Sequence, residues 1–366
     1  MGQRQMHLCL RAENEGGWCK AQRLRLVGTG KVVAVGLGRF IARLGMWMGL
    51  VVVGCSAQPP LGYWEGPATS AVVAAKEWDF GQEKGQVLQT QHYRVFTTIQ
   101  DKEVAHLLPE VMEGALAMYR QVAPDVAMSD RPLDCYMFRC RPEWDTYTQR
   151  YGGSDARVYL QIRSGGYTLH DRYVAYYIGR SGTFSVAAHE GWHQFAGRHF
   201  KGRVPPFLEE GLACMFEAIT WKGNLPRWNL SVNGPRAQNL RKAIEGKYLW
   251  PLDELCAMHA GDIVGEKSDK IDAFYAQAWA FARFMWEGEG GKHREELQKW
   301  LGETAAGTVY DPSYSHRKVT SPWNRRAVGP MVEHYLEMDM KTIDQVYQAY
   351  IRKIAYEEIG EQMKAS

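Results

Sequence analysis

A helix that carries two histidines one turn apart restricts the fold of this chain more than any other feature. Residues 183–199 place apolar side chains at helical spacing, and His189, Glu190 and His193 lie at the centre in the run HEGWH. Histidines at positions i and i+4 share one face of a helix, so they can bind the same metal ion. The glutamate of the motif can then reach a water on that ion. The pattern predicts a zinc site with Glu190 as catalytic base.

A zinc site needs a third protein ligand, and two residues are candidates. One is Glu210, in a second helix predicted over 207–219 after the start signal Pro205-Pro206. The other is His199, which stands at the third-histidine position of the pattern HExxHxxGxxH. That pattern requires a glycine where this chain has Ala196, so His199 fits it only in part.

The two motif helices together resemble a known family. The run HEGWHQF, followed by FLEEGLACMFE, is similar to the gluzincins, which are zinc metallopeptidases, and in particular to their peptidase-MA-like lipoprotein branch. The resemblance implies that Glu210, rather than Glu209, is the third zinc ligand and that the chain cleaves peptide bonds. It also implies a zincin-like fold in which an extended peptide lies along an edge strand at 173–178. The spacing from His193 to Glu210 is shorter than in the familiar aminopeptidases of the family.

Three further residues are candidates for supporting roles. Glu217 stands two helical turns after Glu210, on about the same predicted face, where it can orient a ligand histidine. Cys214 shares that face, and we interpret it as a small packing residue. Tyr275 lies in an aromatic helix, where it is either a core residue or, as in related enzymes, a hydrogen-bond donor to the oxyanion of the reaction.

The first 54 residues differ in charge from the rest of the chain. They contain eight Lys and Arg against two acidic residues, although the whole chain has a formal charge of only +3. Arg39 and Arg43 precede the uncharged run 44–54, which ends at Cys55 and is shorter than the about 20 residues that span a bilayer. This arrangement resembles a bacterial lipoprotein signal. The resemblance implies that Cys55 is lipidated and that the protein is anchored to the cell envelope, outside the cytoplasm.

The chain from Cys55 onward carries 36 basic and 39 acidic side chains, which argues against a nucleic-acid partner. Its four cysteines after the lipidation site permit disulfides in an exported protein. Cys135 and Cys140 would lie on opposite faces of a strand, so we do not expect them to pair with each other.

Periodicity predicts an α+β protein. Strands are expected at 92–99, 131–138, 158–162 and 173–178, and helices at 104–122 and from 142 to near 152, before the two motif helices. Further helices are expected at 238–245, 252–259, 271–286, 293–301 and 342–356. We therefore expect a small mixed sheet with the active-site helix packed on it, followed by a mainly helical C-terminal half.

These elements give four expected regions. Residues 1–54 are a lipoprotein-type signal segment, 55–87 a lipid-proximal linker, 88–220 a zincin-like catalytic half with both motifs, and 221–366 the helical half of the same domain. The expected function is that of a zinc-dependent metallopeptidase acting on a peptide or protein substrate. The alternative is a catalytically silent cell-surface protein of the same fold that binds peptide or glycan.

Overall fold

The computed structural model describes residues 7–8, 71–162, 165–169, 171–223, 225–263, 266–311 and 325–365, with side chains from residue 71 to 356. All of them belong to one unit of the chain. Cys55 and the predicted signal segment, apart from His7–Leu8, lie outside the described residues. A search of the described helices for a segment that could cross a bilayer finds none with the required length and apolarity.

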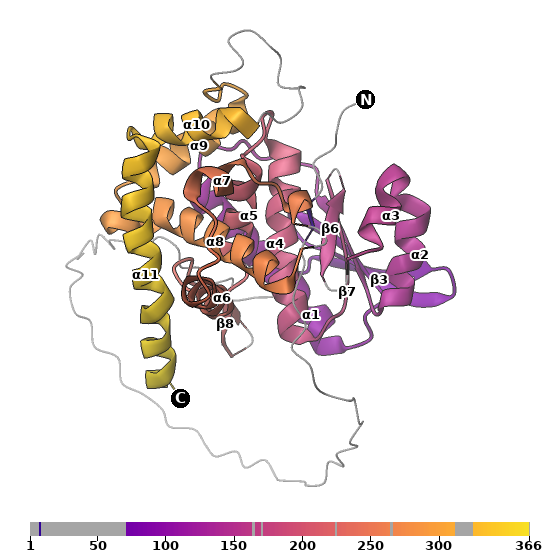
Figure 1. Ribbon diagram of the computed structural model, residues 1–366. Helices are drawn as coiled ribbons and strands as arrows, with labels where there is room; N and C mark the ends of the chain where they lie inside the picture. Colours follow the sequence, from indigo (N-terminus) through magenta and orange to yellow (C-terminus); the bar gives the residue numbers. More distant parts are fainter. Residues whose placement is uncertain are drawn as a thin grey trace, which may run out of the picture. The chain divides into compact units, whose positions relative to one another are not determined.

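One mixed sheet organises the first half of the described chain (Figure 1). Its strand order is β1-β6-β7-β5-β4-β3-β2, where β5 pairs in parallel with both β4 and β7 and every other pair is antiparallel. The strands are β1 (His7–Leu8), β2 (Ala74–Phe80), β3 (Glu83–Gln89), β4 (Tyr93–Thr97), β5 (Leu133–Phe138), β6 (Gly166–Leu169) and β7 (Arg172–Tyr176). The sheet is therefore small and mixed, as the sequence predicted.

The two faces of the sheet are covered by different helices because side chains alternate along each strand. Cys135 and Met137 of β5 belong to the main core, which they share with α1 (Lys102–Val122) and α4 (Arg180–His199). Tyr136 and Phe138 point to the other face, into an aromatic cluster with α2 (Arg141–Tyr151) and α3 (Ala156–Tyr159). The short helix η1 (Gly153–Asp155) links α2 to α3. The motif helix α4 thus packs on the sheet, on the same side as α1.

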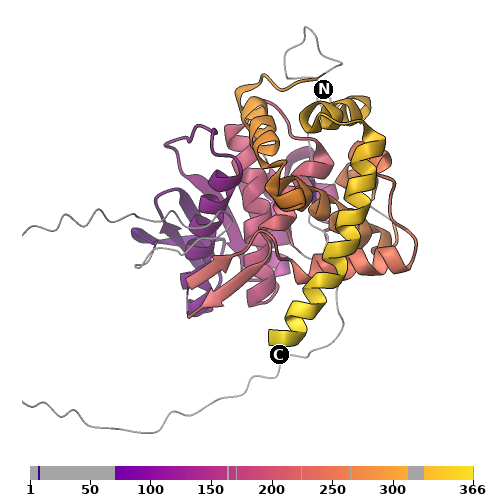
Figure 2. The same cartoon turned by 90° about the vertical axis from the view of Figure 1, so that its left-hand side faces the viewer.

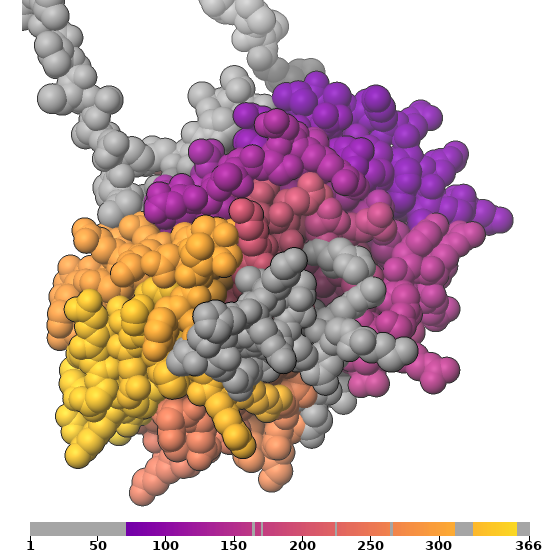
Figure 3. All heavy atoms as spheres, turned by 90° about the horizontal axis from the view of Figure 1, so that it is seen from above, coloured from indigo at the N-terminus to yellow at the C-terminus, as the bar shows by residue number. Residues whose placement is uncertain are grey.

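The rest of the described chain is mostly helical, and most of its helices lie on the side of α4 away from the sheet (Figures 1 and 2). In Figure 3 the indigo and magenta atoms of the first half and the orange and yellow atoms of the second half lie on opposite sides of the molecule. Its long helix α8 packs against both α5 and α6, and α11 packs against α6 and α8. The elements are α5 (Pro206–Met215), β8 (Ile219–Lys222), β9 (Leu225–Trp228), α6 (Gly234–Glu245), α7 (Leu252–Ala257), η2 (Ala260–Asp262), α8 (Ser268–Gly291), α9 (Arg294–Ala306), η3 (Arg325–Ala327), α10 (Val328–Leu336) and α11 (Met340–Ala365). The mixed sheet followed by a helical half confirms the α+β prediction.

Close helix packing explains two glycines in the motifs. A Cβ atom at Gly211 would lie 2.1 Å from the backbone oxygen of Ala278, so the absence of a side chain lets α5 approach α8. A Cβ atom at Gly191 would lie 2.5 Å from the hydroxyl of Tyr119, which donates a hydrogen bond to the Ala188 carbonyl of α4. These two contacts fix α4 and α5 relative to their neighbours.

Four predictions of elements were wrong. Residues 74–87, expected to be irregular linker, form most of the β2–β3 hairpin, because Trp78 and Phe80 have aromatic neighbours on the sheet and Gly81 supplies a positive φ at the turn. Residues 158–162 form the end of α3 and a turn, with Tyr159 and Ile162 buried in the aromatic cluster. Strand β7 is an interior strand, since β6 pairs along its outer side. Helix α5 ends at Met215, four residues before the predicted end, and β8 begins at Ile219.

Candidate metal centre

The two motif histidines and Glu210 converge in a buried cluster. The Nε2 atoms of His189 and His193 lie 3.3 Å apart. The Oε2 atom of Glu210, on α5, lies 3.4 Å from the first of these nitrogens and 3.6 Å from the second. All three residues are at most 1% exposed. Their side chains offer one ligand atom each to a common point, so this cluster could hold a metal ion.

Each histidine contacts a carboxylate through its other ring nitrogen. His189 Nδ1 lies 2.9 Å from Glu217 Oε1, and His193 Nδ1 lies 3.2 Å from Glu209 Oε1. A carboxylate that accepts from Nδ1–H leaves the lone pair of Nε2 directed at the cluster, which is the arrangement that metal-binding histidines use. Glu217 lies just beyond the end of α5 rather than on the helix face that its spacing suggested, yet it reaches the predicted partner.

The carboxylate of Glu217 is held from its other side by a buried arginine. Arg236 donates from Nη2 to Oε1 at 2.6 Å and from Nε to Oε2 at 2.9 Å, and Asn233 Nδ2 donates to Oε2 at 3.1 Å. Burial raises the pKa of Glu217, but the charge of Arg236 and the hydrogen bonds outweigh this and hold that pKa well below its usual range. A cavity of about 250 Å³ adjoins this group and is lined in part by Ser185, Asn233 and Arg236.

The charge state of His193 is set by competing effects. Burial disfavours the imidazolium, but the carboxylates of Glu210 and Glu209 outweigh it and raise the pKa of His193 to about 9. In the absence of a metal, His193 would therefore be a charged imidazolium at neutral pH, with a hydrogen on both ring nitrogens. A cation that binds the cluster has to displace the proton on Nε2.

The catalytic-base candidate, Glu190, faces the sheet at strand β6. The hydroxyl of Thr168 lies 3.0 Å from Glu190 Oε2 and 3.1 Å from the Glu190 carbonyl oxygen, and its one hydrogen can be donated to either of them. Glu190 is fully buried, and Thr168 is nearly so. Strand β6 therefore fixes the orientation of this carboxylate beside the two histidines.

Two other predicted residues, His199 and Cys214, are not part of the group formed by His189, His193 and Glu210. His199, the alternative third ligand, ends α4 and packs on Phe195, and it is in neither of the possible metal-binding groups of the described residues. Cys214 forms a second such group with His189 and Glu217, but Arg236 and Asn233 already engage both oxygens of that glutamate.

Tyr275 of α8 is buried, and its ring lies against the Arg236 guanidinium, 5.1 Å from ring centroid to Cζ. Its predicted role toward an oxyanion stays a prediction. Cys135, Cys140, Cys214 and Cys256 are free thiols.

Four residues of the site were missed by sequence reasoning, namely Thr168, Glu209, Asn233 and Arg236. Glu209 had a local signal, because it adjoins Glu210 and is the second acid of the same motif. Asn233 had a weaker one, because Asn-Gly-Pro is typical of a helix start, and its side chain does cap α6. Thr168 and Arg236 had none.

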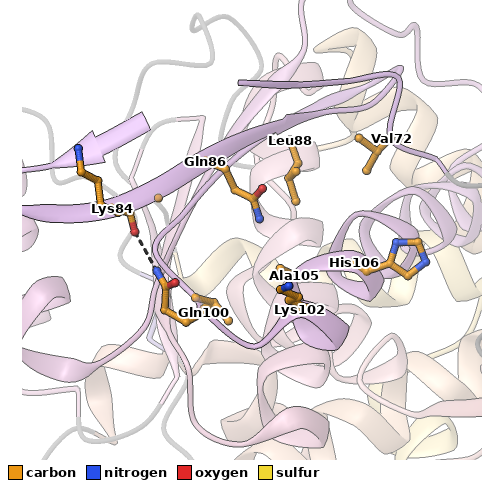
Figure 4. A pocket seen from close by; sticks show the side chains of 10 residues that line it. Val72, Lys84, Gln86, Leu88, Gln100, Lys102, Ala105 and His106 are labelled. Carbon is orange, nitrogen blue, oxygen red and sulfur yellow. Dashed lines mark hydrogen bonds between the residues drawn. The ribbon is translucent and has the colours of Figure 1, made fainter. Parts of the chain in front are cut away.

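A second hollow in the described chain is lined by other residues. It has a volume of about 510 Å³ and lies between β3 and the start of α1 (Figure 4). Lys84, Gln86, Leu88 and Lys102 contribute to its lining, which includes none of the predicted site residues. We therefore base the functional argument on the buried cluster.

No protein-family model, no curated protein and no solved structure matches this chain. Function has to be argued from the geometry and chemistry of the cluster.

Proposed function

We propose that this chain is a zinc-dependent metallopeptidase of the gluzincin type, with His189, His193 and Glu210 as zinc ligands. The observation that carries the proposal is the triangle of ligand atoms, with sides of 3.3, 3.4 and 3.6 Å. Ligands at the usual zinc distances, arranged tetrahedrally, are separated by about 3.3–3.6 Å. Two imidazoles and one carboxylate also form the ligand set typical of catalytic zinc, which keeps one position for water or substrate.

The reaction would use the residues around the cluster in distinct roles. Bound zinc lowers the pKa of a water toward about 7 and polarises a carbonyl oxygen. Glu190 would take the proton of the attacking water at its carboxylate and later pass it to the leaving amine. Thr168, which contacts Glu190 Oε2 at 3.0 Å, would hold that carboxylate in the orientation needed for both transfers.

The pairing of the neighbouring strand β6 supports a peptide as substrate. Strand β6 carries Thr168 and pairs antiparallel with His7–Leu8, with His7 opposite Thr168 and Leu8 opposite Tyr167. Strand β6 therefore has backbone groups that pair with an extended segment, and these groups would become free for a peptide substrate once the predicted signal segment, which includes His7–Leu8, is cleaved before Cys55. The proposal moves the predicted substrate strand from 173–178 to β6. It also keeps Cys55 as the lipid-bearing residue of an envelope-anchored protein outside the cytoplasm.

Zinc analysis combined with a peptide-cleavage assay tests this function. We expect the full chain to bind about one zinc ion and to cleave some members of a broad peptide mixture. Replacing Glu190 by Gln should leave zinc binding intact and slow cleavage by about 10²–10⁴-fold, because the proton acceptor is lost. Glu143→Gln is the matched control, since Glu143 is also a buried glutamate but lies on α2, on the opposite face of the sheet. It should keep the activity.

Two outcomes would contradict the proposal. A chain that binds no zinc at low micromolar concentrations has no zinc centre of this kind. A chain that binds zinc but is as inert as Glu190→Gln on all peptides would instead be a binding protein of the same fold, recognising peptide or glycan.

A further inference from the structure

The buried Arg236 holds the carboxylate of Glu217, which in turn contacts His189. Both oxygens of Glu217 are contacted by the side chain of Arg236, at 2.6 and 2.9 Å, in the two-pronged geometry that arginine forms with carboxylates. The Asn233 amide adds a third donor at 3.1 Å. Side-chain nitrogens of arginine, and the amide nitrogen of asparagine, can only donate. The two Glu217 oxygens are therefore acceptors in these contacts.

This pattern determines what His189 can do. Its Nδ1 lies 2.9 Å from Glu217 Oε1, the oxygen that also accepts from Arg236 Nη2. Glu217, paired on both oxygens with the charged guanidinium, is an ionised carboxylate that has no hydrogen to donate, so Oε1 can bond to Nδ1 only when Nδ1 carries the hydrogen. In the neutral imidazole, Nε2 then has the lone pair, and it faces His193 Nε2 and Glu210 Oε2. We propose that Arg236 is a positioning residue that fixes the metal-binding tautomer of His189 through Glu217.

Arg236 also has a packing role that the test has to separate from this one. Its guanidinium lies over the ring of Tyr275, so it links α6 to α8. Arg283 is a matched control for that role. The two arginines are 9% and 8% exposed, and Arg283 likewise pairs with a carboxylate, that of Glu287, and lies over a ring, that of Trp279. Arg283 is not part of the His189 contacts described above.

The experiment compares Arg236→Gln, Arg236→Lys and Arg283→Gln with the unmodified full chain. The first readout is the tautomer of His189 in metal-free, ¹⁵N-histidine-labelled protein at alkaline pH, from long-range proton–nitrogen couplings. The second is zinc affinity from competition with a chelator. We expect one tautomer, with hydrogen on Nδ1, in the unmodified chain and in Arg283→Gln.

Arg236→Gln should give a mixture of tautomers and bind zinc about 10–100-fold more weakly, the usual effect of losing such a supporting contact. Arg236→Lys should lie between the unmodified chain and Arg236→Gln in both tautomer population and zinc affinity, because an ammonium does not reproduce the planar two-pronged contact.

The outcomes distinguish this inference from the proposed function. Only the zinc-affinity readout of the inference rests on that function, whereas the tautomer readout uses metal-free protein. If Arg236→Gln keeps the single tautomer, the positioning role is wrong, whatever the zinc affinity. Equal losses in Arg236→Gln and Arg283→Gln would also overturn it, since both would then act through packing. If the unmodified chain shows the expected tautomer but binds no zinc, the proposed zinc function fails and the role of Arg236 toward His189 stands.

Discussion

At the scale of single residues, Glu210 and His199 differ in their position relative to the two motif histidines. Glu210 comes from a separate helix and places one oxygen within 3.6 Å of both Nε2 atoms. His199 stands six residues after His193 on the same helix, which is about 240° around its axis, so it points away from the cluster. The choice between them, open in the sequence, is therefore a matter of helix geometry.

This difference predicts the zinc content of two variants. Glu210→Ala should lower zinc affinity by at least about 100-fold, because a ligand is removed and two histidines alone bind zinc weakly. His199→Ala should keep the affinity of the unmodified chain. Inductively coupled plasma mass spectrometry after dialysis against a weak chelator measures both. Zinc retained by Glu210→Ala and lost from His199→Ala would reverse the assignment.

Which site residues the sequence could reveal depends on how far apart they are in the chain. His189, Glu190 and His193 were predictable because a helix fixes the relative direction of residues four apart. The pairing of Glu190 with Thr168 and of Glu217 with Arg236 has no such local rule. These contacts exist because β6 and α6 pack beside the motif helices, and single-sequence periodicity carries no information on that packing.

At the scale of elements, the contact between α5 and α8 positions Glu210. Gly211 directly follows this residue, and its Cα faces the backbone of Ala278 so closely that a methyl group would lie 2.1 Å from the carbonyl oxygen. Gly302 of α9 has the opposite surroundings, because a methyl group there would lie 3.5 Å from its nearest neighbour, in ordinary contact.

Alanine should therefore destabilise the protein at Gly211 but not at Gly302. Gly211→Ala should lower the free energy of unfolding by about 1–3 kcal/mol, since α5 and α8 have to move apart. Gly302→Ala should leave it unchanged or raise it by up to about 1 kcal/mol, because alanine favours helix. Urea denaturation followed by circular dichroism measures both. Equal effects would show that the α5–α8 contact is not tight.

Element type was predictable where a periodic run was long. The observed bounds of α1, β4 and β5 confirm within a few residues the helix and the two strands that their sequence periodicity predicted. Strand β6 was missed because it has only four residues and begins at Gly166, directly after Gly165, and consecutive glycines are typical of turns. Residues 158–162 are mostly apolar and β-branched in part, but Tyr159 and Ile162 are buried among residues of α2 and β6 from a helical turn, so tertiary packing decided the conformation of this segment.

At the scale of the whole described unit, the candidate metal centre joins the two halves of the fold. Glu190 and its partner Thr168 connect α4 to the sheet, whereas Glu210 and Arg236 come from α5 and α6, which both pack on α8. The histidines of α4 contact residues of both halves. Unfolding of either half would therefore disassemble the site, so metal binding should stabilise the unit as a whole.

A histidine outside the cluster, His199, contributes to the pH dependence of the unit's stability. Burial, assisted by the nearby charge of Arg198, lowers the pKa of His199 from its ordinary 6.5 to about 4. Below pH 6.5 the unfolded chain therefore takes up a proton that the folded chain does not accept until about pH 4. Stability should fall as the pH decreases through this window, by on the order of 1 kcal/mol for a half-buried group.

His199→Gln removes this proton uptake, so the difference in unfolding free energy between the variant and the unmodified chain should be constant above pH 6.5 and shift in favour of the variant toward pH 4. Urea titrations at several pH values, with the same metal content in both proteins, measure that difference. The subtraction cancels the carboxylates and other histidines that titrate in the same range. A difference that stays flat across the window would show that His199 is protonated as readily in the folded protein as in the unfolded chain.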